Sequence, residues 1–327
     1  MPGIVGVVSP RARVGALVAV AAVAAAGVTI AATMLTATDE TRNASPQPRL
    51  RPGAPPIVLD LGVRTDAEAR ALRRAIALAG KRRRAAAERI FARYGSVEAQ
   101  VGRAMASWPQ GASRLEALAR DRPRSGAVQL NLGLARFWER DHRGARRAWR
   151  AAKRFEPDST YAVRAGDLLH PEYPVPGLPV FVPSFGLPAA LDRLQPPAQL
   201  RYLERRAGRG GVRDRLLYGV ALQRLGRPVS ARREFAAAAA LAPKDVEAST
   251  AAAVGRFDKD RPQDAFSRLG PLARQYPRAA TIRFHLGLML LWMGDVGEAK
   301  VQFLRAIAAD PGSVPAKQAQ AFLDRLG

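Results

Sequence analysis

Small and apolar residues recur along the second half of the chain with a period of 34 residues. Three consecutive segments align without a gap: 212–245, 246–279 and 280–313. Each contains a small residue, an alanine twelve positions later, a bulky apolar residue four positions further on and a closing proline, which in the last segment are Gly287, Ala299, Phe303 and Pro311. Small residues allow two helices to approach closely, the bulky side chain fills the remaining space, and proline ends the second helix. The pattern therefore predicts one helix pair per segment, with neighbouring pairs burying one another's apolar faces.

This pattern resembles that of the tetratricopeptide repeat family, which has the same period. The resemblance implies an all-α fold, a right-handed superhelical array of helix-turn-helix repeats in which the first helices line a concave groove. The frame extends backwards to a unit with Gly133 and Trp149, and to a weaker first repeat that closes at Pro123. We therefore expect the array over 126–313, and a C-terminal capping helix at 314–327.

The middle of the chain departs from the period, because the 86 residues between Pro157 and Pro243 exceed two repeats by 18. We interpret 160–211 as one helix pair, with helices at about 159–169 and 196–208 and an expanded turn between them. The excess lies in a Pro-rich insertion at 170–188, whose composition favours extended backbone. This insertion is expected to lie in the groove as a built-in ligand, to cover a helix edge, to offer a partner site, or to pack on its own repeat.

Residues 14–38 contain no charged side chain and follow a short basic N-terminus, residues 1–13. A helix of these 25 residues, rising about 1.5 Å per residue, covers the ~30 Å hydrocarbon core of a bilayer. Arginines precede it and Asp39 and Glu40 follow it, which favours an extracytoplasmic body. We predict a transmembrane helix or signal anchor and a single-pass protein of the cell membrane. Cleavage after Ala26, as in a signal peptide, would instead give a secreted form.

Two further segments lie between this stretch and the array. Residues 39–56 form a Pro-rich linker that is expected to be an extended tether. Residues 57–125 form a basic helical region that includes the weak first repeat, and Thr65 or Asp66 is expected to cap its first helix. Its densest positive charge is at Lys81, Arg82, Arg83 and Arg84. These four residues are a candidate contact for anionic phospholipid or cell-wall polymer, or simply a solvated helix face.

The overall charge is strongly positive, with 52 Lys and Arg against 28 Asp and Glu. This balance favours an anionic partner, although a chain rich in Ala and Arg is also typical of a GC-rich, bacterial genome. A nucleic-acid partner is not favoured, because no aromatic residues or recognition motif accompany the basic run.

Candidate catalytic chemistry is scarce. The chain has no cysteine, which excludes disulfides and thiolate metal sites, and its three histidines do not stand at metal-ligand spacing. No nucleophile elbow, phosphate-binding glycine loop or carboxylate pair occurs in the sequence. We therefore predict that the protein is not an enzyme and needs no metal or cofactor.

The resemblance also implies which side chains would line the groove. By position these are Asn131, Leu134, Trp138, Arg213, Leu217, Val220, Arg224, Thr250, Val254, Asp258, His285, Leu288 and Trp292. Some relatives bind a terminal carboxylate with Lys, Asn and Arg, and only Asn131 matches that set. The mixed apolar and arginine lining favours an extended or helical partner segment with some acidic character. For Trp138 and Trp292 the alternative is packing between repeats.

Together these observations predict a non-catalytic protein–protein interaction scaffold tethered to the membrane. Two alternatives remain from the sequence. One is a structural protein that binds anionic cell-wall polymer or lipid through its arginine surface, and the other is a regulator that faces the cytoplasm.

Overall fold

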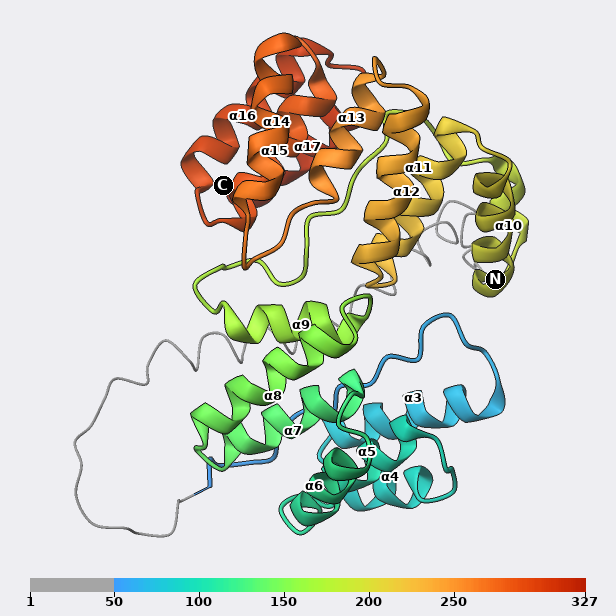
Figure 1. Cartoon of the computed structure of the whole chain (residues 1–327), viewed down its shortest axis with the longest axis vertical. Helices are drawn as coiled ribbons and strands as arrows, with labels where there is room; N and C mark the ends of the chain where they lie inside the picture. Colours follow the sequence, from blue (N-terminus) through green and yellow to red (C-terminus); the bar gives the residue numbers. More distant parts are fainter. Residues whose placement is uncertain (1–49) are drawn as a thin grey trace, which may run out of the picture. The chain divides into compact units, whose positions relative to one another are not determined.

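The structure of the protein is a computed structural model that describes residues 50–327 (Figure 1). Within these residues the chain is helical and contains no strand, as the resemblance implied. It divides into two compact units, which we call the N-terminal unit (50–177) and the C-terminal unit (178–327). No helix in the described range is long and apolar enough to cross a bilayer. The predicted membrane segment at 14–38, the basic stretch before it and most of the linker lie outside the described residues.

The N-terminal unit consists of seven helices within its described residues: α3 (Ala67–Gly80), α4 (Arg84–Phe91), α5 (Val97–Ala106), α6 (Ala112–Asp121), α7 (Gly126–Trp138), α8 (His142–Phe155) and α9 (Thr160–Leu169). Consecutive helices pack on one another, and α7 and α8 form the most extensive pair. One apolar core, which includes Phe91, lies between α3, α4 and α5, and a second one around Trp149 extends from α5 to α9. The unit is therefore a stack of short antiparallel helices (Figure 1).

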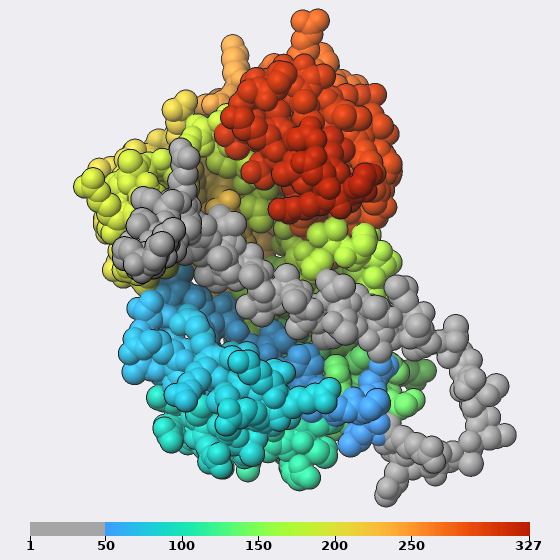
Figure 2. Space-filling model, turned by 180° about the vertical axis from the view of Figure 1, so that it is seen from behind, coloured from blue at the N-terminus to red at the C-terminus, as the bar shows by residue number. Residues whose placement is uncertain are grey.

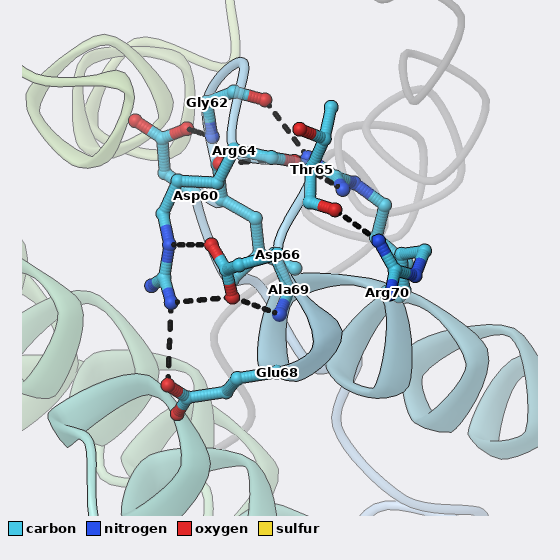
Figure 3. A network of polar contacts seen from close by, with 10 residues as sticks. Asp60, Gly62, Arg64, Thr65, Asp66, Glu68, Ala69 and Arg70 are labelled. Atoms are coloured by element: carbon cyan, nitrogen blue, oxygen red, sulfur yellow. Dashed lines mark hydrogen bonds and ion pairs between the residues drawn. The ribbon is translucent and has the colours of Figure 1, made fainter.

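The first helix of this unit begins where the sequence predicted. Of the two candidate caps, Asp66 takes the role, since its carboxylate accepts a hydrogen bond from the Ala69 amide at 2.9 Å. Arg64 also binds this carboxylate and reaches Glu68, as Figure 3 shows. The hydrogen bonds from Arg64 and Ala69 lower the pKa of Asp66 to about 2. The carboxylate is therefore charged at neutral pH, where it complements the helix dipole.

The C-terminal unit contains one 3₁₀ helix, η2 (Ala189–Arg193), and eight α-helices: α10 (Pro196–Gly208), α11 (Val212–Arg224), α12 (Pro228–Leu241), α13 (Val246–Val254), α14 (Gln263–Gln275), α15 (Ala280–Trp292), α16 (Val296–Ala309) and α17 (Val314–Leu326). The pairs α11/α12, α13/α14 and α15/α16 are the three predicted repeats. Helix α17 packs on α15 and α16, and its Phe322 ring stacks on Phe303 with centroids 5.4 Å apart. This helix covers the last pair, as a capping helix should.

The small residues of the repeats have the packing role that their spacing predicted. A methyl group on Gly287 would lie 2.8 Å from the Phe303 ring, and methyl groups on Gly219 or Gly133 would overlap the bulky side chains of their own repeats. Those side chains, Phe303, Phe235 and Trp149, are fully buried. Because real Cβ atoms do not approach so closely, glycine sets the distance between the two helices of each pair.

The predicted pair at 160–211 is not a pair, although both of its helices have nearly the predicted bounds. Helix α9 packs on α7 and α8, whereas α10 packs on α11, and the two belong to different units. The boundary between the units falls inside the Pro-rich insertion, after Gly177. The insertion therefore separates two helical stacks and is not an expanded turn within one repeat.

Candidate functional site

An extended segment, residues 178–185, lies across the first helices of the three repeats in the C-terminal unit. We call it the C-terminal strap; it is part of the extended trace between α9 and α10 in Figure 1. Gln223 of α11 binds its backbone at two points, accepting from the Phe181 amide at 2.8 Å and donating to the Pro179 carbonyl at 3.3 Å. His285 of α15 accepts from the Val182 amide through Nε2 at 2.9 Å. The strap is thus held by backbone hydrogen bonds to side chains of the repeats.

The chemistry of His285 follows from its surroundings. The residue is fully buried, and its Nδ1 lies 2.6 Å from the Thr281 carbonyl, to which it donates. Nε2 is consequently the unprotonated nitrogen, which is why it accepts from the Val182 amide. Burial lowers the pKa of the imidazole to about 4. The ring is therefore neutral at physiological pH and acts as a fixed acceptor.

Phe181 is the apolar anchor of the C-terminal strap. Its side chain is fully buried against Leu216 and Val220 of α11 and Phe235 of α12. Its ring stacks on His285, with centroids 4.7 Å apart and planes 18° apart. Burying a phenylalanine side chain is worth about 1.5–3 kcal/mol, so Phe181 helps to hold the strap against α11 and α12.

Polar contacts hold the far end of the same strap. Ser184 donates through its hydroxyl to Glu247 of α13 at 2.8 Å, and its amide binds the same carboxylate. The Arg213 guanidinium of α11 lies over the Phe185 ring, 5.0 Å from its centroid. Side chains from α11, α13 and α15 therefore all contact the strap, as they would contact a bound extended peptide.

The N-terminal unit holds a second extended segment, residues 55–61, which we call the N-terminal strap. Asn131 of α7 binds the Val58 backbone twice, accepting from its amide at 3.1 Å and donating to its carbonyl at 2.7 Å. The Tyr161 hydroxyl of α9 accepts from the Asp60 amide at 2.9 Å. Burial raises the pKa of this phenol well above its usual value. Ile57 and the apolar residues that follow it complete the contact with the core.

Asn131 and His285 occupy the same place in their repeats. Each stands two residues before the small residue, Gly133 or Gly287, and each is fully buried. Each binds the backbone of its own unit's strap. The two units therefore use one position of the repeat for the same purpose. Sequence analysis selected both residues as groove residues for a partner. For His285 the bound segment belongs to the Pro-rich insertion, for which the groove was one of the four expected places.

The other predicted groove residues are placed in several different environments. Val220, Val254, Leu134 and Leu288 are buried, with Val220 and Val254 in the core that holds Phe181. Leu217 packs instead with α10 and η2 residues. Thr250 is buried and donates to the Val246 carbonyl of its own helix at 2.7 Å.

The charged residues and the two tryptophans among the predicted groove residues also differ in their exposure and contacts. Arg213 is exposed, whereas burial lowers the pKa of Arg224. Asp258 lies in the turn between α13 and α14, where its carboxylate accepts from the Asp260 amide at 2.9 Å. Trp138 and Trp292 are half-buried against apolar cores, which is the packing alternative.

The four basic residues at 81–84 in the N-terminal unit also differ in their exposure. Lys81, Arg82 and Arg83 are exposed in the turn between α3 and α4. Arg84 turns inward and donates to the carbonyls of Met105, Ala106 and Pro55, the last two at 3.4 Å each. It satisfies carbonyls at the C-terminus of α5, which have no partner within the helix. Arg84 is therefore a structural residue that joins α4 and α5 to the N-terminal strap, and not a free anionic contact.

Three residues that form hydrogen bonds with the straps were not predicted from the sequence: Gln223, Glu247 and Tyr161. Polar residues of helical surfaces carry no individual signal. The straps themselves share a sequence pattern, because PIVLDLG at 56–62 and PVFVPSFG at 179–186 both begin with proline, continue with three consecutive apolar residues and end with glycine. Within residues 50–327 no cluster of His, Asp and Glu could hold a metal ion.

No family model and no curated protein matches the chain. Among solved structures, yeast Tom70 matches with a TM-score of 0.32 and 12% identity, over 87% of this chain and 50% of that one. The Cut9–Hcn1 hetero-tetramer of the APC/C matches with a TM-score of 0.30 and 14% identity, over 77% of this chain and 55% of that one. The chain thus spans about half the length of these structures. Its repeat architecture is shown by its own helix pairs.

Proposed function

We propose that this protein is a non-catalytic scaffold that binds an extended segment of a partner protein in the groove of its C-terminal unit. The supporting observation is the C-terminal strap, which fills that groove as a bound peptide would. Its backbone is held by Gln223 and His285, and Phe181 enters an apolar site between α11 and α12. A partner segment with an aromatic residue at the place of Phe181 would find the same contacts.

The C-terminal strap would compete with a partner segment for the same groove. A segment in the same chain acts at an effective concentration on the order of millimolar. The apparent affinity of a partner falls in proportion to the fraction of molecules with an open groove. If the strap itself bound the groove with an intrinsic dissociation constant of about 1 μM, a competing peptide would thus be weakened about a thousand-fold. Partners must therefore bind the groove better than the strap does, or must be held nearby by a second contact.

The test uses a fluorescent peptide with the sequence of residues 176–187 and the full chain. Wild type should bind it weakly, because its own strap occupies the groove. The Phe181→Ala chain should bind it at least about ten-fold more tightly, because the strap loses its anchor. Adding Gln223→Ala to that chain should abolish the gain, because the groove loses both bonds that Gln223 makes to the peptide backbone.

The matched control is Phe155→Ala, which removes a partly buried ring at the end of α8 in the N-terminal unit. It should leave the affinity of the peptide at the wild-type level. If the Phe181→Ala chain keeps its helical circular dichroism and still does not bind the peptide, the groove is not an exchangeable binding site and the proposal fails.

The proposed scaffold is tethered to the cell membrane by residues 14–38, with its body extracytoplasmic. This part of the proposal is supported by the uncharged stretch and by the acidic residues that follow it. Protease added to intact cells should digest the body. Digestion only after lysis would place the body in the cytoplasm and support the alternative of a regulator that faces the cytoplasm.

A further inference from the structure

A hollow in the N-terminal unit is surrounded by positive charge. It measures about 230 Å³ and lies between α3 and the end of α4. Its lining consists of Arg70, Ala71, Arg74, Ile90, Arg93 and Tyr94. Both helices are in the blue-to-cyan part of the surface in Figure 2. Arg70 and Arg74 are one helical turn apart on α3, so their side chains project from the same face.

No acidic residue lines this hollow. The acids at the start of α3 are already engaged, since Arg64 binds Asp66 at 2.9 Å and Glu68 at 3.2 Å (Figure 3). The acid of α4, Glu88, faces Arg103 and Arg114 at 3.8 and 3.9 Å. Within the described residues, neither Arg74 nor Arg93 forms an ion pair. Three guanidinium groups therefore share one hollow without a counter-ion from residues 50–327.

The arrangement is partly fixed in place. Arg70 donates to the Thr65 carbonyl in the loop before α3, as Figure 3 shows. Ala71 and Ile90 form the apolar part of the lining, and Tyr94 completes it. Like charges at one site repel one another, and an anion between them removes that repulsion. Guanidinium groups bind phosphate oxygens in pairs of parallel hydrogen bonds, which lysine does not do.

We propose that this hollow is a binding site for a phosphate group, either free or carried by a lipid. Its volume lies below the 300–1,000 Å³ of sites for drug-sized ligands, so a single phosphate or headgroup fits better than a nucleotide. The proposal is independent of the groove. It differs from the candidate anionic contact at 81–84, because none of those residues lines the hollow.

The experiment measures two probes on the full chain. Inorganic phosphate is titrated into the protein by calorimetry. Flotation compares binding to phosphatidylglycerol vesicles with binding to phosphatidylcholine vesicles. Insertion of the apolar residues 14–38 would contribute equally to both kinds of vesicle and therefore does not affect the comparison. The variant Arg74→Gln/Arg93→Gln should lower the affinity for the phosphate-bearing probe at least ten-fold. The control Arg147→Gln/Arg150→Gln removes the same charge from exposed positions on α8 and should change it less than two-fold.

Each outcome has one meaning. Saturable binding of phosphate that only the hollow variant loses supports a site for the free anion. A preference for phosphatidylglycerol that only that variant loses supports a lipid headgroup. Equal losses in the two variants, or no saturable binding of either probe, would overturn the proposal. All four substituted arginines are exposed, so circular dichroism should confirm that both variants keep the helical content of wild type.

Discussion

The Val182 amide donates to Nε2 of His285 at 2.9 Å, although 103 residues separate the two in sequence. This bond joins the Pro-rich segment to the last repeat of the array. It requires a neutral imidazole, because a protonated ring has no acceptor. The strap is thereby sensitive to the charge of one buried side chain.

Acid should release the C-terminal strap through His285. Its pKa is lowered to about 4 in the folded chain, against 6.5 when exposed. The unfolded state therefore binds the proton more readily, and stability falls as the pH drops from about 6.5 to 4. The loss should be on the order of 3 kcal/mol across that window. Urea unfolding of wild type and of His285→Gln at pH 7 and pH 4.5 measures it, and the glutamine variant should show a smaller pH dependence. Equal pH dependence in both chains would exclude His285 as the cause.

Asn131 should contribute strongly to the stability of the N-terminal unit, because it forms two hydrogen bonds with the backbone of Val58. Replacing it with leucine leaves the Val58 amide and carbonyl without partners, and each buried unpaired group costs about 1–3 kcal/mol. We expect a loss of about 2–6 kcal/mol in urea unfolding of the full chain. Tyr161→Phe removes only the bond to the Asp60 amide and should cost about 1 kcal/mol. A loss below that of Tyr161→Phe would show that Asn131 does not hold the strap.

The repeats could be predicted from the sequence because each depends on local geometry. Gly287 and Phe303 are sixteen residues apart, and their contact is repeated in two other units, so the spacing alone reveals it. The bounds of α9 and α10 were predictable for the same reason.

The straps could not be located in this way. The groove was one of four expected places for the Pro-rich insertion, and the sequence could not choose among them. The contact of Val182 with His285 spans 103 residues and occurs once, and extended segments have no period. The position of Asn131 in the repeat was informative, but the sequence could not tell whether its partner was another protein or Val58. The buried position of the Arg84 side chain could not be predicted either, because it depends on hydrogen bonds to carbonyls at the end of α5.

Gly287→Ala should destabilise the C-terminal unit because the added methyl group would lie 2.8 Å from the Phe303 ring. Overpacking of this kind costs about 1–3 kcal/mol. Phe303→Leu in the same chain should recover part of that loss, since a smaller side chain makes room. Gly297→Ala is the control, because its nearest neighbour would be 4.0 Å away and alanine favours helix by up to about 1 kcal/mol. Thermal unfolding of the four chains measures these effects, and a neutral Gly287→Ala would contradict the packing argument.

Arg84 and Arg83 are adjacent in sequence but should respond differently to the same substitution. Arg84→Gln removes donors from the carbonyls of Met105, Ala106 and Pro55, and burial already lowers the pKa of its guanidinium. Unpaired carbonyls at the end of α5 should cost about 1–3 kcal/mol in urea unfolding. Arg83→Gln lies in the exposed turn and should stay within about 0.5 kcal/mol of wild type. The two variants carry the same net charge, so any difference between them reflects the hydrogen bonds of Arg84. If both are neutral, Arg84 does not stabilise the unit and its charge is available to an external anion.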